Sequence, residues 1–125
     1  MTVPPTILLV EDNRDNRRIF RDVLRNAGFQ VVEAEDGGQA LATAHQTPPD
    51  LVLMDLSIPV VDGWECTRRL KADPLTCAVP VIALTAHAMR GDEERARAAG
   101  CDGYLSKPIS PKRVVEEVRR FLKLD

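Results

Sequence analysis

Polar residues that can do chemistry follow four apolar runs of this sequence, at residues 7–10, 51–54, 81–84 and 104–106. In chain order, the residues that follow the runs are Glu11 with Asp12, Asp55, Thr85 and Lys107. If the four runs are parallel strands of one sheet, their carboxyl ends lie at one edge. Open α/β sheets bind ligands at that edge. The pattern therefore predicts a site of three carboxylates, a hydroxyl and an ammonium.

The three acids of this set favour a metal ion. Clustered carboxylates repel one another strongly unless a cation lies between them. Carboxylate oxygens are the ligands of hard divalent cations, and we expect Mg²⁺. Helix capping is the competing interpretation, because Asp12 or Asn13 could cap a helix that follows, where acids also suit the helix dipole.

Asp55 can also act as a nucleophile, because carboxylates form aspartyl-phosphate intermediates. Mg²⁺ would neutralise both the carboxylate and the incoming phosphoryl oxygens. Thr85, beside the small Ala86, can donate a hydrogen bond into the crevice. Lys107 supplies a point charge for a phosphoryl oxygen, and the Lys107–Pro108 pair suggests a cis peptide.

Strand-like and helix-like segments alternate along the whole chain. Strands are expected near residues 7–10, 30–34, 51–55, 80–85 and 102–106. Five helices are expected between and after them: around Ile19–Ala27 with Gly28 behind it, around Ala40–Ala44 before Pro48, at 64–71 before Asp73–Pro74, at 90–99 before Gly100, and after a Ser110 cap with Pro111 at its first position.

Five β-α units with continuously apolar strands and short loops indicate an α/β fold, with a parallel sheet covered on both faces. We expect residues 1–125 to form a single domain, since no linker, repeat or low-complexity tract interrupts the pattern. The helix at 90–99 has little apolar surface and should be the most loosely held.

Composition excludes several classes of protein. The net charge of −2 leaves no basic footprint for nucleic acid. No apolar stretch reaches membrane length, and residues 1–5 lack the features of a signal peptide. Three cysteines without a Cys-x-x-Cys pair fit a reducing cytoplasm with buried or inert thiols.

Together, these motifs resemble the receiver domain of bacterial two-component systems, the CheY-like response regulators. The resemblance covers almost the whole chain. It rests on residues 7–13 (ILLVEDN), 53–63 (LMDLSIPVVDG), 83–86 (ALTA) and 105–108 (LSKP). Residues 89–94 and 100–104 resemble stand-alone regulators of the DivK type, and also receivers attached to hybrid histidine kinases.

The resemblance implies a flavodoxin-like doubly wound fold with five parallel strands in the order 2-1-3-4-5. It implies that Asp55 accepts a phosphoryl group from a kinase histidine, with oxygens held by Thr85 and Lys107. Mg²⁺ would be bound directly by Asp12 and Asp55, through water by Glu11, and by the backbone carbonyl of Ser57.

The resemblance also implies a switch and partners. Tyr104 would turn inward as Thr85 moves, and plain packing is the alternative role for Tyr104. Upstream partners would be a sensor histidine kinase or a histidine phosphotransfer protein. A downstream protein would bind the face formed by the fourth helix, fifth strand and fifth helix. We expect a monomer or weak dimer that catalyses only its own phosphorylation and dephosphorylation, and is otherwise not an enzyme.

Two positions that vary within the family, here Ser57 and His87, would line the path of the hydrolytic water and tune the lifetime of the phosphoryl group. For His87 an incidental position is the alternative. His45 is expected on a helix surface.

Four competing functions remain. A Mg²⁺-dependent phosphatase with an aspartate nucleophile usually carries a second Asp where Ser57 stands. A flavodoxin-like electron carrier needs a phosphate-cradling first loop, whereas residues 11–15 would repel phosphate. A receiver used only as an inert interaction module would not need the intact acid site. A receiver excised from a hybrid kinase would share every motif. If the chain is not such a fragment, no effector follows residue 125, and we expect output through protein–protein contact.

Overall fold

The computed structural model describes residues 3–56, 58, 61–85, 92–106 and 108–124. Five strands alternate with five helices through this part of the chain. In chain order they are β1 (Thr6–Val10), α1 (Arg14–Asn26), β2 (Gln30–Ala34), α2 (Gly37–Gln46), β3 (Leu51–Asp55), α3 (Gly63–Ala72), β4 (Val81–Thr85), α4 (Asp92–Ala99), β5 (Gly103–Ser106) and α5 (Pro111–Phe121).

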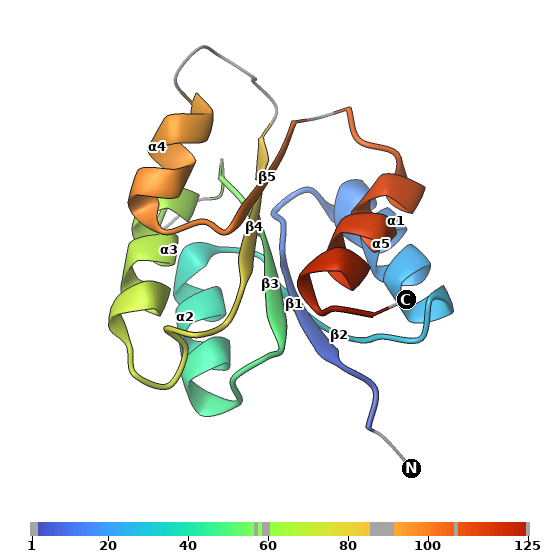
Figure 1. Cartoon of the computed structure of the whole chain (residues 1–125), viewed down its shortest axis with the longest axis horizontal. Helices are drawn as coiled ribbons and strands as arrows, with labels where there is room; N and C mark the ends of the chain where they lie inside the picture. The colour runs from blue at the N-terminus through green and yellow to red at the C-terminus, as the bar shows by residue number, and fades with distance from the viewer. Residues whose placement is uncertain (1–2, 57, 59–60, 86–91, 107, 125) are drawn as a thin grey trace.

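The strands form one parallel sheet in the order β2-β1-β3-β4-β5 (Figure 1). This confirms the predicted α/β class and the strand order that the family resemblance implied. Every residue of β3 and β4 is buried, as is all of β1 except its first residue. Strands covered on both faces must be apolar throughout, which explains the continuous apolar runs. At the edge, β2 alternates between exposed and half-buried residues before its buried last one.

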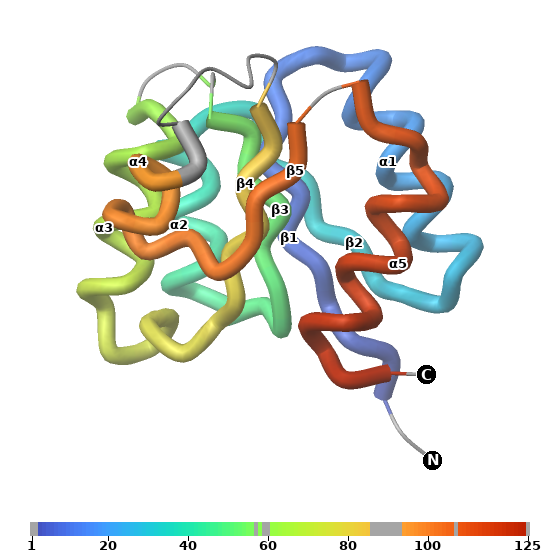
Figure 2. Tube along the Cα trace, turned by 45° about the horizontal axis from the view of Figure 1, so that its top comes forward, coloured from blue at the N-terminus to red at the C-terminus, as the bar shows by residue number. Residues whose placement is uncertain are grey.

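The helices divide between the two faces of the sheet. Helices α1 and α5 cover one face, and α2, α3 and α4 cover the other (Figures 1 and 2). Because side chains alternate along a strand, each strand contributes to two separate cores. In β1, Leu8 and Val10 belong to the core beneath α2–α4, while Ile7 and Leu9 belong to the core beneath α1 and α5.

Four helices begin at a side-chain cap that accepts a backbone N–H from the first turn. The pairs are Asn13 with Asn16 N at 2.9 Å, Asp36 with Gln39 N at 2.8 Å, Asp62 with Glu65 N at 2.9 Å, and Ser110 with Arg113 N at 3.2 Å. The Ser110 cap with Pro111 at the first position was predicted, and Asn13 is the cap of α1. Asp62 was predicted only as loop, although the spacing of Asp62 and Glu65 is a capping-box signature.

Helix α4 has few buried side chains. Among its described side chains, Ala96 and Ala99 are buried, whereas Glu94, Arg95, Arg97 and Ala98 are exposed. Two small side chains bury little apolar area. The sparse apolar surface expected for this helix is therefore present, and its loose attachment stays a prediction.

Two of the three thiols lie in the core. Burial raises the pKa of the Cys66 thiol to about 12 and also raises the pKa of Cys101, so both remain protonated at neutral pH. Cys77 is exposed, so of the expected buried or inert thiols only Cys66 and Cys101 are shown to be buried.

His45 lies on the surface of α2 as predicted, and it also ties two elements together. Its Nδ1 lies 2.7 Å from the Asp73 carboxylate, at the end of α3. The hydrogen bond from His45, aided by the Leu75 amide, holds the pKa of Asp73 below its usual value.

In the described part of the chain, no helix combines the length and apolar character that crossing a membrane requires.

Candidate functional site

The three predicted acids meet at the carboxyl edge of the sheet. Val10 at the end of β1 pairs with Met54 of β3, so the residues that follow them, Glu11 and Asp55, lie side by side. Asp12 comes next along the chain. One carboxylate oxygen from each of the three acids lies within 4.8 Å of the other two. The sheet register therefore brings together what the sequence separates by more than forty residues.

This geometry suits a small divalent cation. Mg²⁺ binds oxygens at about 2.0–2.1 Å in octahedral geometry, so its ligands lie roughly 3–4 Å from one another. The carboxylate oxygens of the three acids, which lie within 4.8 Å of one another, would have to move only slightly closer together. Glu11 is 0% exposed and Asp55 only 3%, and buried carboxylates demand compensation of their charge. The oxygen donors present, and their burial, fit Mg²⁺.

Glu11 is held through its backbone and its side chain. Its backbone N–H donates to Ala34 O of β2 at 3.1 Å, and its carboxylate accepts from the Asn13 backbone N–H at 3.3 Å. Its carbonyl oxygen accepts from the Arg17 guanidinium at 3.0 Å. The Arg17 side chain is only 13% exposed. We find no local pattern in the sequence that marks this role.

Asp55 is the last residue of β3, and α3 begins against it. The next backbone N–H, of Leu56, continues the ladder to Leu84 O at 3.0 Å. Gly63, the first residue of α3, approaches so closely that an added Cβ would lie 2.5 Å from Leu56 Cα and 2.7 Å from the Asp55 carbonyl oxygen. A glycine at the start of α3 therefore lets this helix pack directly on the strand that carries Asp55.

Thr85 occupies the corresponding end of β4. It is 5% exposed and follows Leu84, the register partner of Asp55. Its own partner is Ser106, the last residue of β5. Three of the predicted residues lie outside the described part of the chain, namely Ser57, His87 and Lys107. Their roles, including the cis peptide at Lys107–Pro108, stay predictions.

Tyr104 lies in β5, where it pairs with Ala83. It is half-buried and packs against the core on the α2–α4 side of the sheet. The predicted switch of Tyr104 stays a prediction.

A family model for the response regulator receiver domain matches residues 7–119. The chain belongs to the response regulator receiver domain family. Among curated proteins, this receiver domain is similar to the polar-differentiation response regulator DivK of Brucella anthropi. The two are 44% identical over 120 residues, which cover 96% of this chain and 98% of the relative. The predicted family membership, and the likeness to the DivK type, are confirmed.

Solved structures show the same likeness in three dimensions. The receiver domain of a sensor histidine kinase from Pseudomonas aeruginosa, with a magnesium ion coordinated in its active-site cleft, superposes with a TM-score of 0.90 at 38% identity. It covers 97% of this chain and 99% of that one. A putative response regulator from Chloroflexus aurantiacus superposes with a TM-score of 0.92 at 32% identity, over 97% of this chain and 99% of that one. The receiver domain therefore belongs to two-component signalling, and the phosphatase and electron-carrier alternatives are not favoured.

Proposed function

We propose that this receiver domain is a phosphorelay response regulator in which Asp55 accepts a phosphoryl group from a histidine of a sensor kinase or a phosphotransfer protein. The convergence of Glu11, Asp12 and Asp55 within 4.8 Å at the sheet edge is the observation that carries the proposal. The magnesium ion in the similar Pseudomonas receiver supports the same metal here.

The transfer is a displacement at phosphorus. An Asp55 carboxylate oxygen attacks, the bond between phosphorus and the donor histidine nitrogen breaks, and the imidazole leaves with the electron pair. Thr85 and Lys107 hold phosphoryl oxygens as negative charge spreads over them. Mg²⁺ would neutralise charge on both reactants when bound. Asp12 and Asp55 would hold it directly, Glu11 through water, and Ser57 through its backbone carbonyl.

The proposed output is a change of surface rather than turnover of a substrate. We assign residues 1–125 to one receiver domain of the cytoplasm that acts only on its own phosphoryl group, as a monomer or weak dimer. Phosphorylation would alter the face formed by α4, β5 and α5, to which a downstream protein binds. Ser57 and His87 would set how long the phosphoryl group lasts.

Incubation with acetyl phosphate tests the proposal. Intact-mass spectrometry should detect one added phosphoryl group in the presence of Mg²⁺, and none after chelation with EDTA. Absence of labelling under both conditions would overturn the proposed function. Multiple-turnover hydrolysis of a phosphomonoester would instead indicate a phosphatase.

Replacing Asp12 by Asn should weaken Mg²⁺ binding by roughly tenfold or more, because even groups that only support metal ligands contribute this much. The same change should raise the melting temperature of the metal-free protein, since one of three mutually repelling charges is lost. Isothermal calorimetry measures the affinity, and thermal unfolding in EDTA measures the stability. Equal Mg²⁺ affinity in the two proteins would remove Asp12 from the ligand set.

Phosphorylation should change the mobility of the α4–β5 side more than that of the opposite side. Thr85 and Lys107 would anchor that side to the phosphoryl group, and α4 buries little apolar area. Regulatory elements come from the least stable parts of a fold. A beryllofluoride adduct of Asp55, which stands in for the phosphoryl group, should alter amide exchange in residues 86–108 more than in 19–45. Equal changes in both ranges would contradict this output surface.

A further inference from the structure

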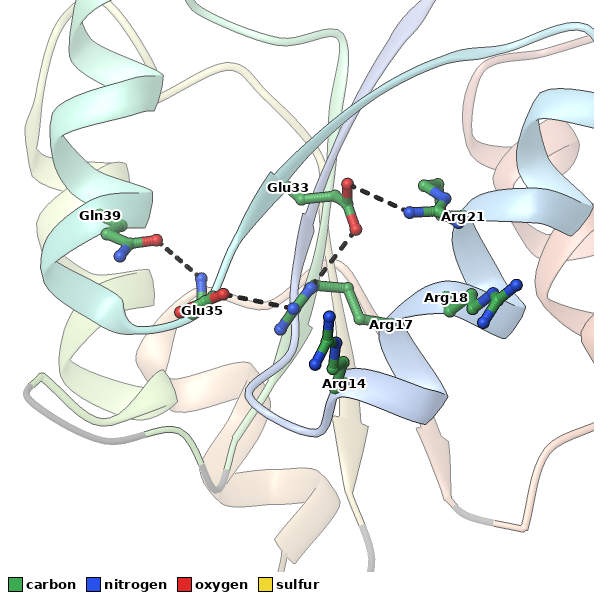
Figure 3. Close-up of a pocket in the computed structure, with 7 residues that line it drawn as sticks. All are labelled: Arg14, Arg17, Arg18, Arg21, Glu33, Glu35 and Gln39. Carbon is green, nitrogen blue, oxygen red and sulfur yellow. Dashed lines mark hydrogen bonds and ion pairs between the residues drawn. The ribbon is translucent and has the colours of Figure 1, made fainter.

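Arg17 connects three parts of the fold beside the acid site. Its backbone N–H donates to Asn13 O at 2.9 Å, which places it in the first turn of α1. Its guanidinium contacts Glu33 of β2 at 3.4 Å and Glu35 just beyond β2 at 3.3 Å (Figure 3). The third contact is with the carbonyl oxygen of Glu11 at 3.0 Å. Helix, edge strand and β1–α1 loop are thus joined through one side chain.

The contact with Glu11 bears on the orientation of Asp12. The Glu11 carbonyl belongs to the planar peptide unit that ends at the Asp12 Cα. The preceding backbone N–H, of Glu11, is bound to Ala34 O at 3.1 Å. Holding the carbonyl as well determines the direction in which the chain leaves towards Asp12. Asp12 is itself exposed, and its own side chain has little packing to orient it.

The acidic partners of Arg17 keep the guanidinium in place. Arg17 lines a surface groove of about 520 Å³ between α1 and β2, together with the three arginines at positions 14, 18 and 21. Arg17 contacts the β1–α1 loop, whereas Arg21 contacts Asp22 at 3.0 Å and Glu33 at 3.7 Å. A guanidinium has five donors in a rigid fork, so Arg17 can bind both carboxylates and the carbonyl together.

We propose that Arg17 is a positioning residue for the magnesium site: by holding the Glu11 carbonyl against β2, it presents Asp12 and Glu11 to the cation. This inference rests on the proposed function, because it requires that the three acids bind Mg²⁺. Arg17 itself touches neither the cation nor the phosphoryl group. It acts as the partners of metal ligands do elsewhere, where their loss costs on the order of tenfold or more in affinity.

The sign of the effect separates positioning from simple electrostatics. A positive charge close to the acids opposes the binding of a second positive charge, so removal of the Arg17 charge alone would tighten Mg²⁺ binding. Loss of the hydrogen bond to Glu11 has the opposite effect, because the loop must then be ordered when the metal binds. We expect the second effect to exceed the first.

The experiment measures Mg²⁺ affinity by calorimetry on the full chain without phosphodonor. Arg17→Met should bind Mg²⁺ on the order of tenfold more weakly. Arg17→Lys retains the positive charge but not the forked set of donors, and its Mg²⁺ affinity should fall less than that of Arg17→Met. Arg21→Met is the matched control, since it removes an arginine of the same groove that also contacts Glu33, and its affinity should equal that of the wild type. Thermal unfolding in EDTA verifies that each variant is folded.

A kinetic readout distinguishes positioning from general loss of structure. With acetyl phosphate, the Mg²⁺ concentration for half-maximal labelling should rise in Arg17→Met, while the rate at saturating Mg²⁺ stays near that of the wild type. Unchanged or tighter Mg²⁺ binding in folded Arg17→Met would overturn the inference.

Glu33→Gln provides a second test should Arg17→Met fail to fold. It removes one carboxylate that holds Arg17, and should weaken Mg²⁺ binding in the same direction but to a smaller extent. If Glu33→Gln and Arg17→Lys, measured separately, both bind Mg²⁺ as tightly as the wild type, the inference is overturned as well. A wild-type protein that binds no Mg²⁺ would overturn the proposed function, and the role of Arg17 with it; wild-type binding that Arg17 does not influence overturns the role alone.

Discussion

Asp55→Asn should take up no phosphoryl group from acetyl phosphate or from a phosphorylated kinase. An amide oxygen is a poor nucleophile, whereas a carboxylate forms the acyl phosphate directly. The substitution keeps the shape of a residue that is only 3% exposed, and it removes one of three clustered negative charges. The fold should therefore persist, and the melting temperature should equal or exceed that of the wild type. Among the variants considered, this is the largest expected effect, a complete loss of labelling.

Intact-mass spectrometry measures this loss, and circular dichroism monitors the fold. Asp62→Asn is a matched control. Asp62 caps α3, the helix that follows the strand carrying Asp55, and Asn caps helices as well as Asp does. This control should be labelled at the wild-type rate. Peptide mapping of the wild type should place the label at Asp55. Labelling of a folded Asp55→Asn protein at the wild-type rate would remove Asp55 from the role of acceptor.

Gly63→Ala should destabilise the protein by about 3 kcal/mol, in the upper range for overpacking of a core. Helix propensity alone would make this change favourable by up to about 1 kcal/mol. The sign reverses because the added Cβ would lie 2.5 Å from Leu56 Cα and 2.7 Å from the Asp55 carbonyl oxygen, both of them backbone atoms. Backbone atoms of a buried strand cannot turn aside as a flexible side chain does. Relief of the clash must displace either α3 or the end of β3.

Urea unfolding measures the change in stability, and labelling by acetyl phosphate reports on Asp55. We expect slower labelling of the folded Gly63→Ala protein, since its acceptor strand is displaced. Gly28→Ala is the control, because Gly28 has a φ of +97° but no atom within 4 Å of an added Cβ. It should cost about 1 kcal/mol through backbone strain alone and leave labelling unchanged. A Gly63→Ala protein as stable as the wild type would contradict the close approach of α3.

The chemistry of the acid site could be predicted from the sequence because its information is local. A buried parallel strand must be apolar along its length, so the first polar residue marks its end. In this way the sequence located Glu11, which follows β1, and Asp55, which ends β3. The start of the last helix, at Ser110 and Pro111, could be predicted equally well, because a cap depends on the hydrogen bonds of one helical turn. The order of the strands came only from the resemblance to the family, since the residues of one strand do not indicate which other strand pairs with it.

Tertiary structure alone decided which groups surround the acids. Register between β1 and β3 set the spacing of at most 4.8 Å between the carboxylate oxygens of Glu11, Asp12 and Asp55. Nothing near Arg17 in the sequence indicates a role at the site, yet Glu33 of the edge strand β2 and Glu35 just beyond it hold its guanidinium on the β1–α1 loop. Such contacts depend on how distant segments approach one another, which no periodicity within a single segment encodes. Sequence by itself therefore determined the reactive groups of this receiver domain, and the packing of the sheet and its helices determined what positions them.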